Sequence, residues 1–145
     1  MMAGRARRST SSRRTEQRRE LARILEEADR PLGVQELHAL GQQAVPGLSV
    51  ATVYRNIRTW LGDGWLVPVP VPGEADRYEV AGKGSHHHFR CEACGRVFEV
   101  FGTPAGIDRL TPDGFALRDL RIYLYGECAD CRERTRAAGA RGSER

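Results

Sequence analysis

Long apolar runs are absent from this sequence. No segment approaches the roughly 20 apolar residues that a membrane-spanning helix needs. The N-terminus is rich in arginine and serine and has no apolar middle region, so it does not resemble a secretory signal. The sequence therefore predicts a protein that neither spans a membrane nor is exported.

Cysteine is also scarce, and its spacing is informative. The only four cysteines form two C-x-x-C pairs, Cys91 with Cys94 and Cys128 with Cys131. Without a secretory signal, such pairs indicate thiolates in a reducing cytoplasm rather than disulfides. Two pairs together predict one zinc ion held by four sulfurs. The 33 residues between the pairs exceed the usual zinc-ribbon spacing, so a further helix or strand must separate them.

The apolar content limits the size of any core. With 145 residues and 40% apolar residues, the chain has room for one ordinary domain or two small ones. Two separate small cores would each be marginally stable. A structural zinc ion is a common way for a small domain to gain the missing stability.

Positive charge is concentrated at the N-terminus. The net charge is +4, and the first 30 residues hold nine arginines against five acidic residues. A basic arm of this kind suits an anionic polymer such as DNA. A solvated tail with no partner is the equally plain alternative, and the arm alone does not decide between them.

Three amphipathic helices are predicted in the first half of the chain, over residues 15–29, 34–41 and 50–61. His38 lies beside the apolar side of the second helix, which favours a boundary or core role over metal binding. Ser49 is a suitable N-cap for the third helix, and Gly62 a suitable C-cap. On the third helix, one face is apolar and the opposite face is polar, as in a DNA-recognition helix. The polar face and its edges carry Thr52, Tyr54, Arg55, Arg58 and Thr59.

A two-stranded ribbon is predicted next, with strands near 65–71 and 77–80 around a Pro-Gly turn. The prolines at 68, 70 and 72 lie two residues apart, so their missing N–H donors all fall on one edge. The other edge remains free to pair. A ribbon after three helices is the wing of a winged helix, which strengthens the DNA-binding interpretation.

The second half of the chain predicts a small sheet around the cysteines. Strands are expected at 89–90, 96–101 and 116–125, with a weak helix over 103–114. An exposed sheet edge here would favour pairing with a second copy. The predicted class is α+β, an N-terminal winged-helix DNA-binding domain followed by a small α/β dimerisation domain with a four-cysteine zinc site. The expected divisions are a disordered basic arm (1–12), the winged helix (13–80), a hinge (81–85), the dimerisation domain (86–132) and a disordered tail (133–145). The segment after Cys131 is expected to be helical briefly before it becomes disordered.

Four sequence features together resemble the ferric uptake regulator family of metal-sensing repressors. They are Thr15-x-Gln17-Arg18, the run from Leu48 to Arg55, His86-His87-His88-Phe89-x-Cys91-x-x-Cys94-Gly95, and Cys128-x-x-Cys131. The resemblance covers about residues 13–132 and is most like the zinc uptake regulator branch. It implies a cytoplasmic, zinc-responsive repressor that binds A/T-rich operator DNA as a homodimer, with no membrane or small-molecule substrate.

The same resemblance implies two metal sites. Cys91, Cys94, Cys128 and Cys131 match the structural zinc ligands, and Glu79, His86 and His88 match three ligands of a regulatory metal. Further ligand positions of the family are occupied here by Pro31 and Ala81, which leaves the fourth ligand unidentified. His87 matches a further site whose other ligands are missing, so no ligand role is expected for it.

The resemblance also implies which residues contact DNA. Tyr54 and Arg55 match residues of the recognition helix that contact bases or phosphate. The stretch around Arg13, Arg14 and Arg18 matches the segment that approaches the DNA backbone and minor groove. Thr52 and Arg58 complete the expected DNA-binding set.

Several alternatives remain open from the sequence. The regulatory metal could be iron, manganese or nickel, or an iron used to sense peroxide. The chain could instead be a DNA-binding regulator with only the structural zinc. A zinc hydrolase using Glu79, His86 and His88 is disfavoured, because little chain remains to enclose a pocket. A thiol-redox role for the cysteine pairs is disfavoured if all four hold one zinc.

Overall fold

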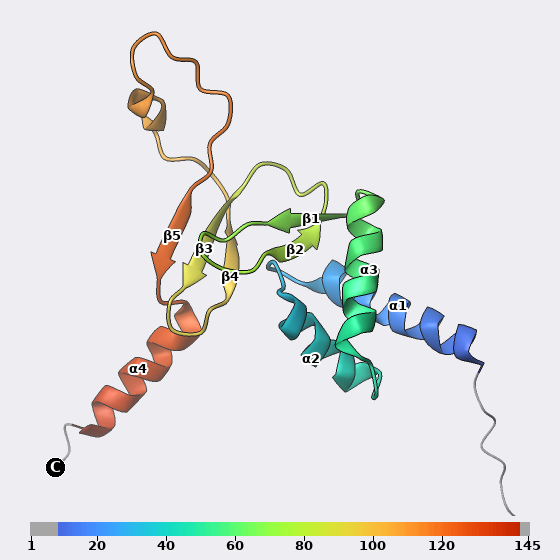
Figure 1. The fold of residues 1–145 in the computed structure, drawn as a ribbon. Helices are drawn as coiled ribbons and strands as arrows, with labels where there is room; N and C mark the ends of the chain where they lie inside the picture. The colour runs from blue at the N-terminus through green and yellow to red at the C-terminus, as the bar shows by residue number, and fades with distance from the viewer. Residues whose placement is uncertain (1–8, 143–145) are drawn as a thin grey trace, which may run out of the picture. The chain divides into compact units, whose positions relative to one another are not determined.

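The computed structural model describes residues 9–142 of the chain, and Figure 1 shows its elements. The chain divides into two compact units, the first ending at Gly82 and the second beginning at Lys83. None of the helices within residues 9–142 has the length and apolar character needed to cross a membrane.

Three helices form the body of the first unit: α1 (Thr10–Glu27), α2 (Val34–Ala44) and α3 (Val50–Gly62). Each contributes apolar residues to one core, in which Leu21, Leu37 and Val53 are almost completely buried. The predicted helices are therefore confirmed. His38 lies at the edge of this core, where its Nε2 atom is 2.9 Å from the carbonyl oxygen of Leu48. This hydrogen bond agrees with the predicted boundary role.

Two side-chain caps define where helices begin. Ser49 accepts a hydrogen bond from the backbone N–H of Thr52, as predicted for the start of α3. Ser9 accepts one from the N–H of Ser11, and α1 therefore begins at Thr10 rather than near residue 15. Residues 10–12, expected in a disordered arm, belong to this helix. The rest of the predicted arm, residues 1–8, lies outside the described residues.

The predicted ribbon is present as strands β1 (Leu66–Val69) and β2 (Arg77–Val80), which pair antiparallel. Pro68 lies opposite Tyr78 in this pair, so proline is accommodated in the strand as expected. Tyr78 also exchanges backbone hydrogen bonds with Leu32, in the loop between α1 and α2. The ribbon is thereby fixed to the helical core.

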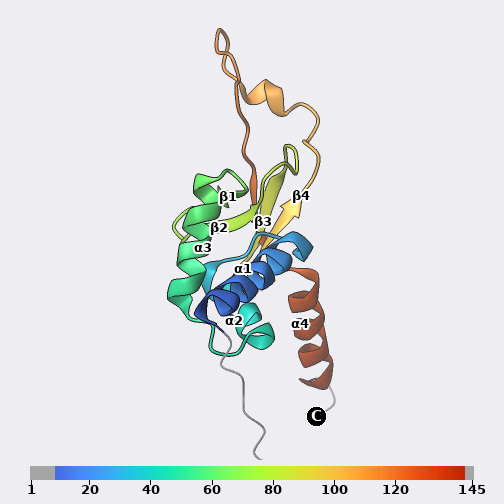
Figure 2. The same ribbon diagram turned by 90° about the vertical axis from the view of Figure 1, so that its right-hand side faces the viewer.

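The second unit contains a three-stranded sheet in the order β4-β3-β5. Strand β3 (His87–Cys91) pairs antiparallel with β4 (Val97–Val100) and parallel with β5 (Tyr123–Gly126). The parallel pairing requires a long connection between β4 and β5. That connection projects away from the sheet in Figures 1 and 2.

Two predictions for this connection were wrong. The helix expected over 103–114 is reduced to one 3-10 turn, η1 (Ile107–Leu110), because Gly106 has a left-handed φ of 80° and Pro112 follows. The strand expected over 116–125 is regular only from Tyr123. Its apolar alternation is typical of a strand, but residues 116–121 pair with no strand in the described part of the chain. Alternation of apolar residues does not show whether a neighbouring strand is present to pair with the segment.

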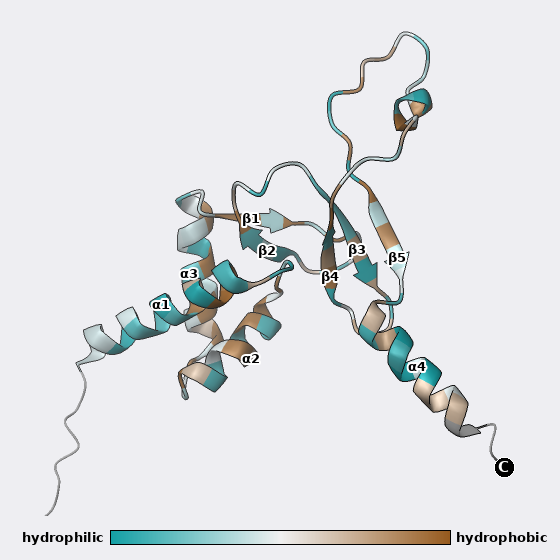
Figure 3. Cartoon of the chain, turned by 180° about the vertical axis from the view of Figure 1, so that it is seen from behind, coloured by the Kyte–Doolittle hydropathy of each residue, from teal (hydrophilic) through white to brown (hydrophobic). Residues whose placement is uncertain are grey.

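The C-terminal segment also differs from its prediction. Helix α4 (Ala129–Gly142) continues through residues 133–142, where a short helical stretch followed by a disordered tail was expected. The last predicted tail residues, 143–145, lie outside the described residues. Figure 3 shows that its middle turns are hydrophilic. Arginine, glutamate and alanine are good helix formers, and the Arg132 N–H bonds the carbonyl of Cys128 in the first turn. Local propensity therefore continues the helix beyond Cys131.

Candidate metal centres and DNA-binding surface

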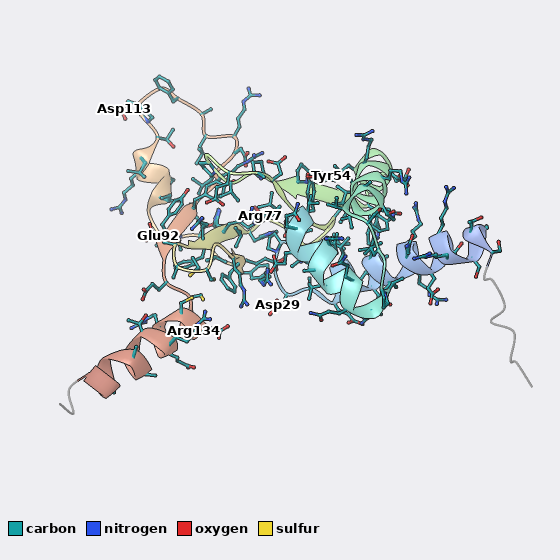
Figure 4. All side chains as sticks on the ribbon, turned by 60° about the horizontal axis from the view of Figure 1, so that its bottom comes forward. Asp29, Tyr54, Arg77, Glu92, Asp113 and Arg134 are labelled. Atoms are coloured by element: carbon teal, nitrogen blue, oxygen red, sulfur yellow. The ribbon has the colours of Figure 1, made fainter. Side chains whose placement is uncertain are left out.

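The four cysteines converge at one end of the sheet in the second unit. Cys91 ends β3 and Cys94 lies in the turn toward β4, while Cys128 and Cys131 lie at the start of α4. The pairing of Cys91 with Gly126, between β3 and β5, brings the second pair to the first. Figure 4 shows the sulfur atoms beside the first turns of α4, near the labelled Arg134.

The spacing of the sulfurs fits a zinc ion. All four thiols are free, and their Sγ atoms lie within 4.8 Å of one another. The Sγ atoms of Cys94 and Cys128 are 3.9 Å apart. A tetrahedral ion with Zn–S bonds of about 2.3 Å separates its sulfurs by roughly 3.8 Å. The quartet is therefore arranged as zinc requires.

Hydrogen bonds and burial act on the thiols in opposite directions. The backbone N–H of Cys128 donates a hydrogen bond to Sγ of Cys91 at 3.3 Å. This hydrogen bond, together with one from the backbone N–H of Cys94, lowers the pKa of Cys91 to about 6. Burial raises the pKa of Cys131 to about 12, although Arg134 donates to its sulfur at 3.0 Å. One thiolate forms readily, and a bound cation would stabilise the others.

A second candidate centre lies at the start of β3. The rings of His86 and His88 have centroids 4.9 Å apart, and their ligand nitrogens lie within 4.8 Å of each other. Nε2 of His88 is buried and has no hydrogen-bond partner within residues 9–142. Burial is the larger cause that lowers the pKa of His88 to about 4, and the charge of the neighbouring His86 is the second. A neutral imidazole with an unpartnered nitrogen fits the requirement of a metal ligand.

His87, between these two histidines, has a different environment. It is 5% exposed, and its Nδ1 accepts a hydrogen bond from the backbone N–H of Ile122 at 3.2 Å. Its Nε2 lies 3.4 Å from the hydroxyl of Thr103. Both ring nitrogens thus have protein neighbours, in agreement with the expectation that His87 is not a ligand.

Carboxylates are available in both units. Glu79, the predicted ligand, lies on β2 of the first unit and is 6% exposed. Glu99 lies on β4 directly opposite His88, and its charge acts on that imidazole. Glu99 was not among the ligands predicted from the sequence, because only the β3–β4 register sets it opposite His88. Pro31, at one of the family's ligand positions, is fully buried and offers no donor.

The candidate DNA surface is the exposed side of α3. Tyr54 is 50% exposed, and Arg55 and Arg58 also face solvent. Figure 4 shows Tyr54 on this helix. Thr52 differs from its prediction because it is only 8% exposed. Its hydroxyl accepts a hydrogen bond from Arg55 at 3.0 Å, so Thr52 orients that arginine from within the fold.

A polar groove continues this surface between α1 and α3. It has a volume of about 320 Å³ and is lined by Arg14, Thr15, Arg18, Thr52, Arg55, Asn56 and Thr59. Four of the predicted DNA-binding residues therefore meet here. The guanidinium of Arg18 lies over the Trp60 ring, 5.3 Å from its centroid, which restrains it. Arg13 lies outside the groove, against Gly47.

Comparisons with known proteins agree with this arrangement. Residues 9–125 match the model of the ferric uptake regulator family. A ferric uptake regulation protein of Rhizobium leguminosarum bv. viciae is 34% identical over 79% of this chain and 82% of its own length. The peroxide operon regulator of Bacillus subtilis is 31% identical over 59% of this chain and 61% of its own. A solved structure described as a zinc-bound manganese uptake regulator is 32% identical, with a TM-score of 0.70 over 78% of this chain and 88% of that one.

Proposed function

The chain belongs to the ferric uptake regulator family, whose members are metal-responsive transcriptional regulators and not enzymes, and on this premise we propose that it is a zinc-responsive repressor. It binds A/T-rich operator DNA as a homodimer in the cytoplasm. The observation that supports sensing is the His86–His88 pair, in which the buried Nε2 atom of His88 has no hydrogen-bond partner among the described residues. This pair is separate from the cysteine quartet.

Two zinc ions per chain take part in this proposal. The first is structural and is held by Cys91, Cys94, Cys128 and Cys131. The second is regulatory, with His86, His88 and Glu79 as ligands. Glu99 is proposed as the fourth ligand, because it lies opposite His88 on the adjacent strand. It would take the place of the ligands that Pro31 and Ala81 cannot provide.

Zinc is proposed as the regulatory metal because two imidazoles and two carboxylates suit a four-coordinate ion. The similar structure described as zinc-bound supports this choice. The same donors also bind ferrous iron, manganese and nickel. The relatives named for ferric uptake and peroxide response make iron the main competitor. Metal titrations must therefore include iron and manganese.

On DNA, α3 would occupy the major groove, with Tyr54, Arg55 and Arg58 directed toward the bases and phosphates. Arg13, Arg14 and Arg18 would contact the adjacent backbone and minor groove. In a homodimer, two such helices would read half-sites about 34 Å apart. Thr52 contributes by holding Arg55.

Regulation then follows from metal bound by ligands of both units. Glu79 belongs to the DNA-binding unit, and the histidines and Glu99 to the other. A shared ion would favour the arrangement in which both recognition helices of a dimer reach their half-sites. The required preference corresponds to a coupling of about 1–3 kcal/mol.

The decisive experiment combines metal content with DNA binding. Purified full-length protein should hold two zinc ions per chain, of which mild chelation removes one. Operator affinity should fall on chelation and return with free zinc, but not in His86→Ala or His88→Ala. One unremovable zinc, with DNA binding indifferent to added metals, would show a DNA-binding regulator that senses something other than metal.

A further inference from the structure

Lysine occurs only once in this chain, at position 83, against 22 arginines. This lysine is the first residue of the second unit and precedes His86 by three positions. Its Nζ forms an ion pair with Oε1 of Glu99. The side chains are 25% and 10% exposed, so the pair is largely shielded from water.

The ion pair involves the same carboxylate that faces the histidine pair. Glu99 lies opposite His88 in the β3–β4 register, and its charge acts on that imidazole. Within the described residues, however, the carboxylate of Glu99 does not join the ligand atoms of His86 and His88 within 4.8 Å. The carboxylate is near the histidine pair but is engaged by Lys83.

We propose that Lys83 is an internal competitor of the regulatory metal for Glu99. In the metal-free protein, its ammonium group forms an ion pair with the carboxylate of Glu99. When the metal binds, the carboxylate exchanges the ammonium for the ion, and Lys83 moves to solvent. Lys83 therefore sets the metal concentration at which the site fills. This inference rests on the proposed function, because it requires a metal at the His86–His88 pair.

The identity of the side chain suits such an exchange. Lysine is a compact point charge on a flexible stem, whereas arginine holds a carboxylate through two fixed hydrogen bonds. The backbone around Lys83 is also unusual, because Gly82 and Gly84 have left-handed φ angles of 89° and 77°. Lysine can leave the carboxylate by rotating its own side chain, without a change in the sheet. The single lysine of the chain, among 22 arginines, thus lies at the carboxylate where the proposed exchange takes place.

The test measures zinc affinity of the second site by competition with a fluorescent chelator, in full-length protein whose cysteine quartet keeps its zinc. Lys83→Met should tighten zinc binding roughly tenfold, since it removes a partly buried ion pair that metal must otherwise break. Glu99→Gln should weaken binding. Lys83→Met combined with Glu99→Gln should match Glu99→Gln alone, because the competition acts only through that carboxylate.

Matched variants separate competition from a general effect of charge. Arg109→Met removes one exposed positive charge from the same unit and should change zinc affinity less than twofold. Lys83→Arg retains the charge and should bind zinc no more tightly than the wild type. Thermal melts of each variant establish that the unit remains folded, and Lys83→Gln provides a polar replacement if Lys83→Met does not fold.

Each remaining outcome has a distinct meaning. If Lys83→Met tightens zinc binding equally in the Glu99→Gln background, the effect is long-range electrostatics and the competition is overturned. If Lys83→Met binds zinc with the same affinity as the wild type, the competition is overturned, but the proposed regulatory site still stands. If neither wild type nor Lys83→Met binds a second ion, the proposed metal sensing fails and the competition fails with it.

Discussion

The backbone N–H of Ile122 donates a hydrogen bond to Nδ1 of His87, 3.2 Å away, and so joins the start of β3 to the end of the projecting connection. His87→Ala would leave this partly buried donor unpaired, at a cost of up to about 1–3 kcal/mol. We expect a lower melting temperature with unchanged zinc content. His87→Asn is the control, because its Oδ1 can replace Nδ1 as acceptor. Loss of one zinc from folded His87→Ala would instead make His87 a ligand.

The cysteine quartet should be necessary for folding of the second unit. In small zinc-finger peptides, binding of the structural zinc contributes about 10–16 kcal/mol to the free energy of folding. Cys128→Ser should therefore lose the tightly held zinc and the β-sheet signal in circular dichroism. Asp130→Ala, an exposed change within the same C-x-x-C turn, should keep both. A folded, zinc-free Cys128→Ser protein would contradict the structural role.

Thr52 and Arg55 should act on operator binding as one unit. Arg55→Ala should weaken specific binding by about 1–3 kcal/mol, through loss of a base or phosphate contact. Thr52→Val removes the hydroxyl that accepts from Arg55, with little change in volume, and should have a smaller effect. In the Arg55→Ala background, Thr52→Val should add nothing. An undiminished effect there would mean that Thr52 contacts DNA by itself.

Arg14 lines the groove between α1 and α3 and is predicted to contact phosphate. Arg14→Ala should weaken specific and non-specific DNA to a similar extent. It should also reduce the slope of log affinity against log salt by about 1, because one fewer counterion is released. Affinities measured at several salt concentrations test this. A change confined to the specific site would assign Arg14 to base recognition.

Gly41 and Gly139 form a matched pair for stability. A Cβ at Gly41 would lie 2.5 Å from Cδ2 of Leu48 and 3.0 Å from Cδ2 of Leu21, both buried. Gly41→Ala should thus destabilise the first unit by about 1–3 kcal/mol. No atom of the described residues lies within 4 Å of a Cβ at Gly139 in α4, so Gly139→Ala should be neutral or stabilising by up to about 1 kcal/mol. Denaturant unfolding compares the two, and equal effects would refute the packing argument.

Local signals in the sequence predicted most of the first unit. The period of apolar residues and the Ser49 cap identified α3, and the alternate prolines allowed the ribbon to be placed. The C-x-x-C spacing predicted the convergence of four sulfurs, because that chemistry depends on few neighbours. These features depend mainly on residues close together in the chain.

Features that depend on distant neighbours were not predictable in the same way. Leu117 and Leu120 alternate as in a strand, but strand formation requires a partner that β3 offers only from Tyr123 onward. Thr52 looked exposed by helical spacing, yet it is buried where it lines the groove between α1 and α3. Glu99 became a candidate ligand only through the register that sets it opposite His88.

The projecting connection is closed at its base by the pairing of β3 with β5, by the His87–Ile122 bond and by the sulfur quartet. Its tip near Pro112 and Gly114 is exposed and makes no strand pairing. Closing a longer loop between fixed ends costs little additional entropy. The tip is therefore the place where this chain can accept inserted sequence, such as a fluorophore-binding peptide, without disturbing the metal centre below it.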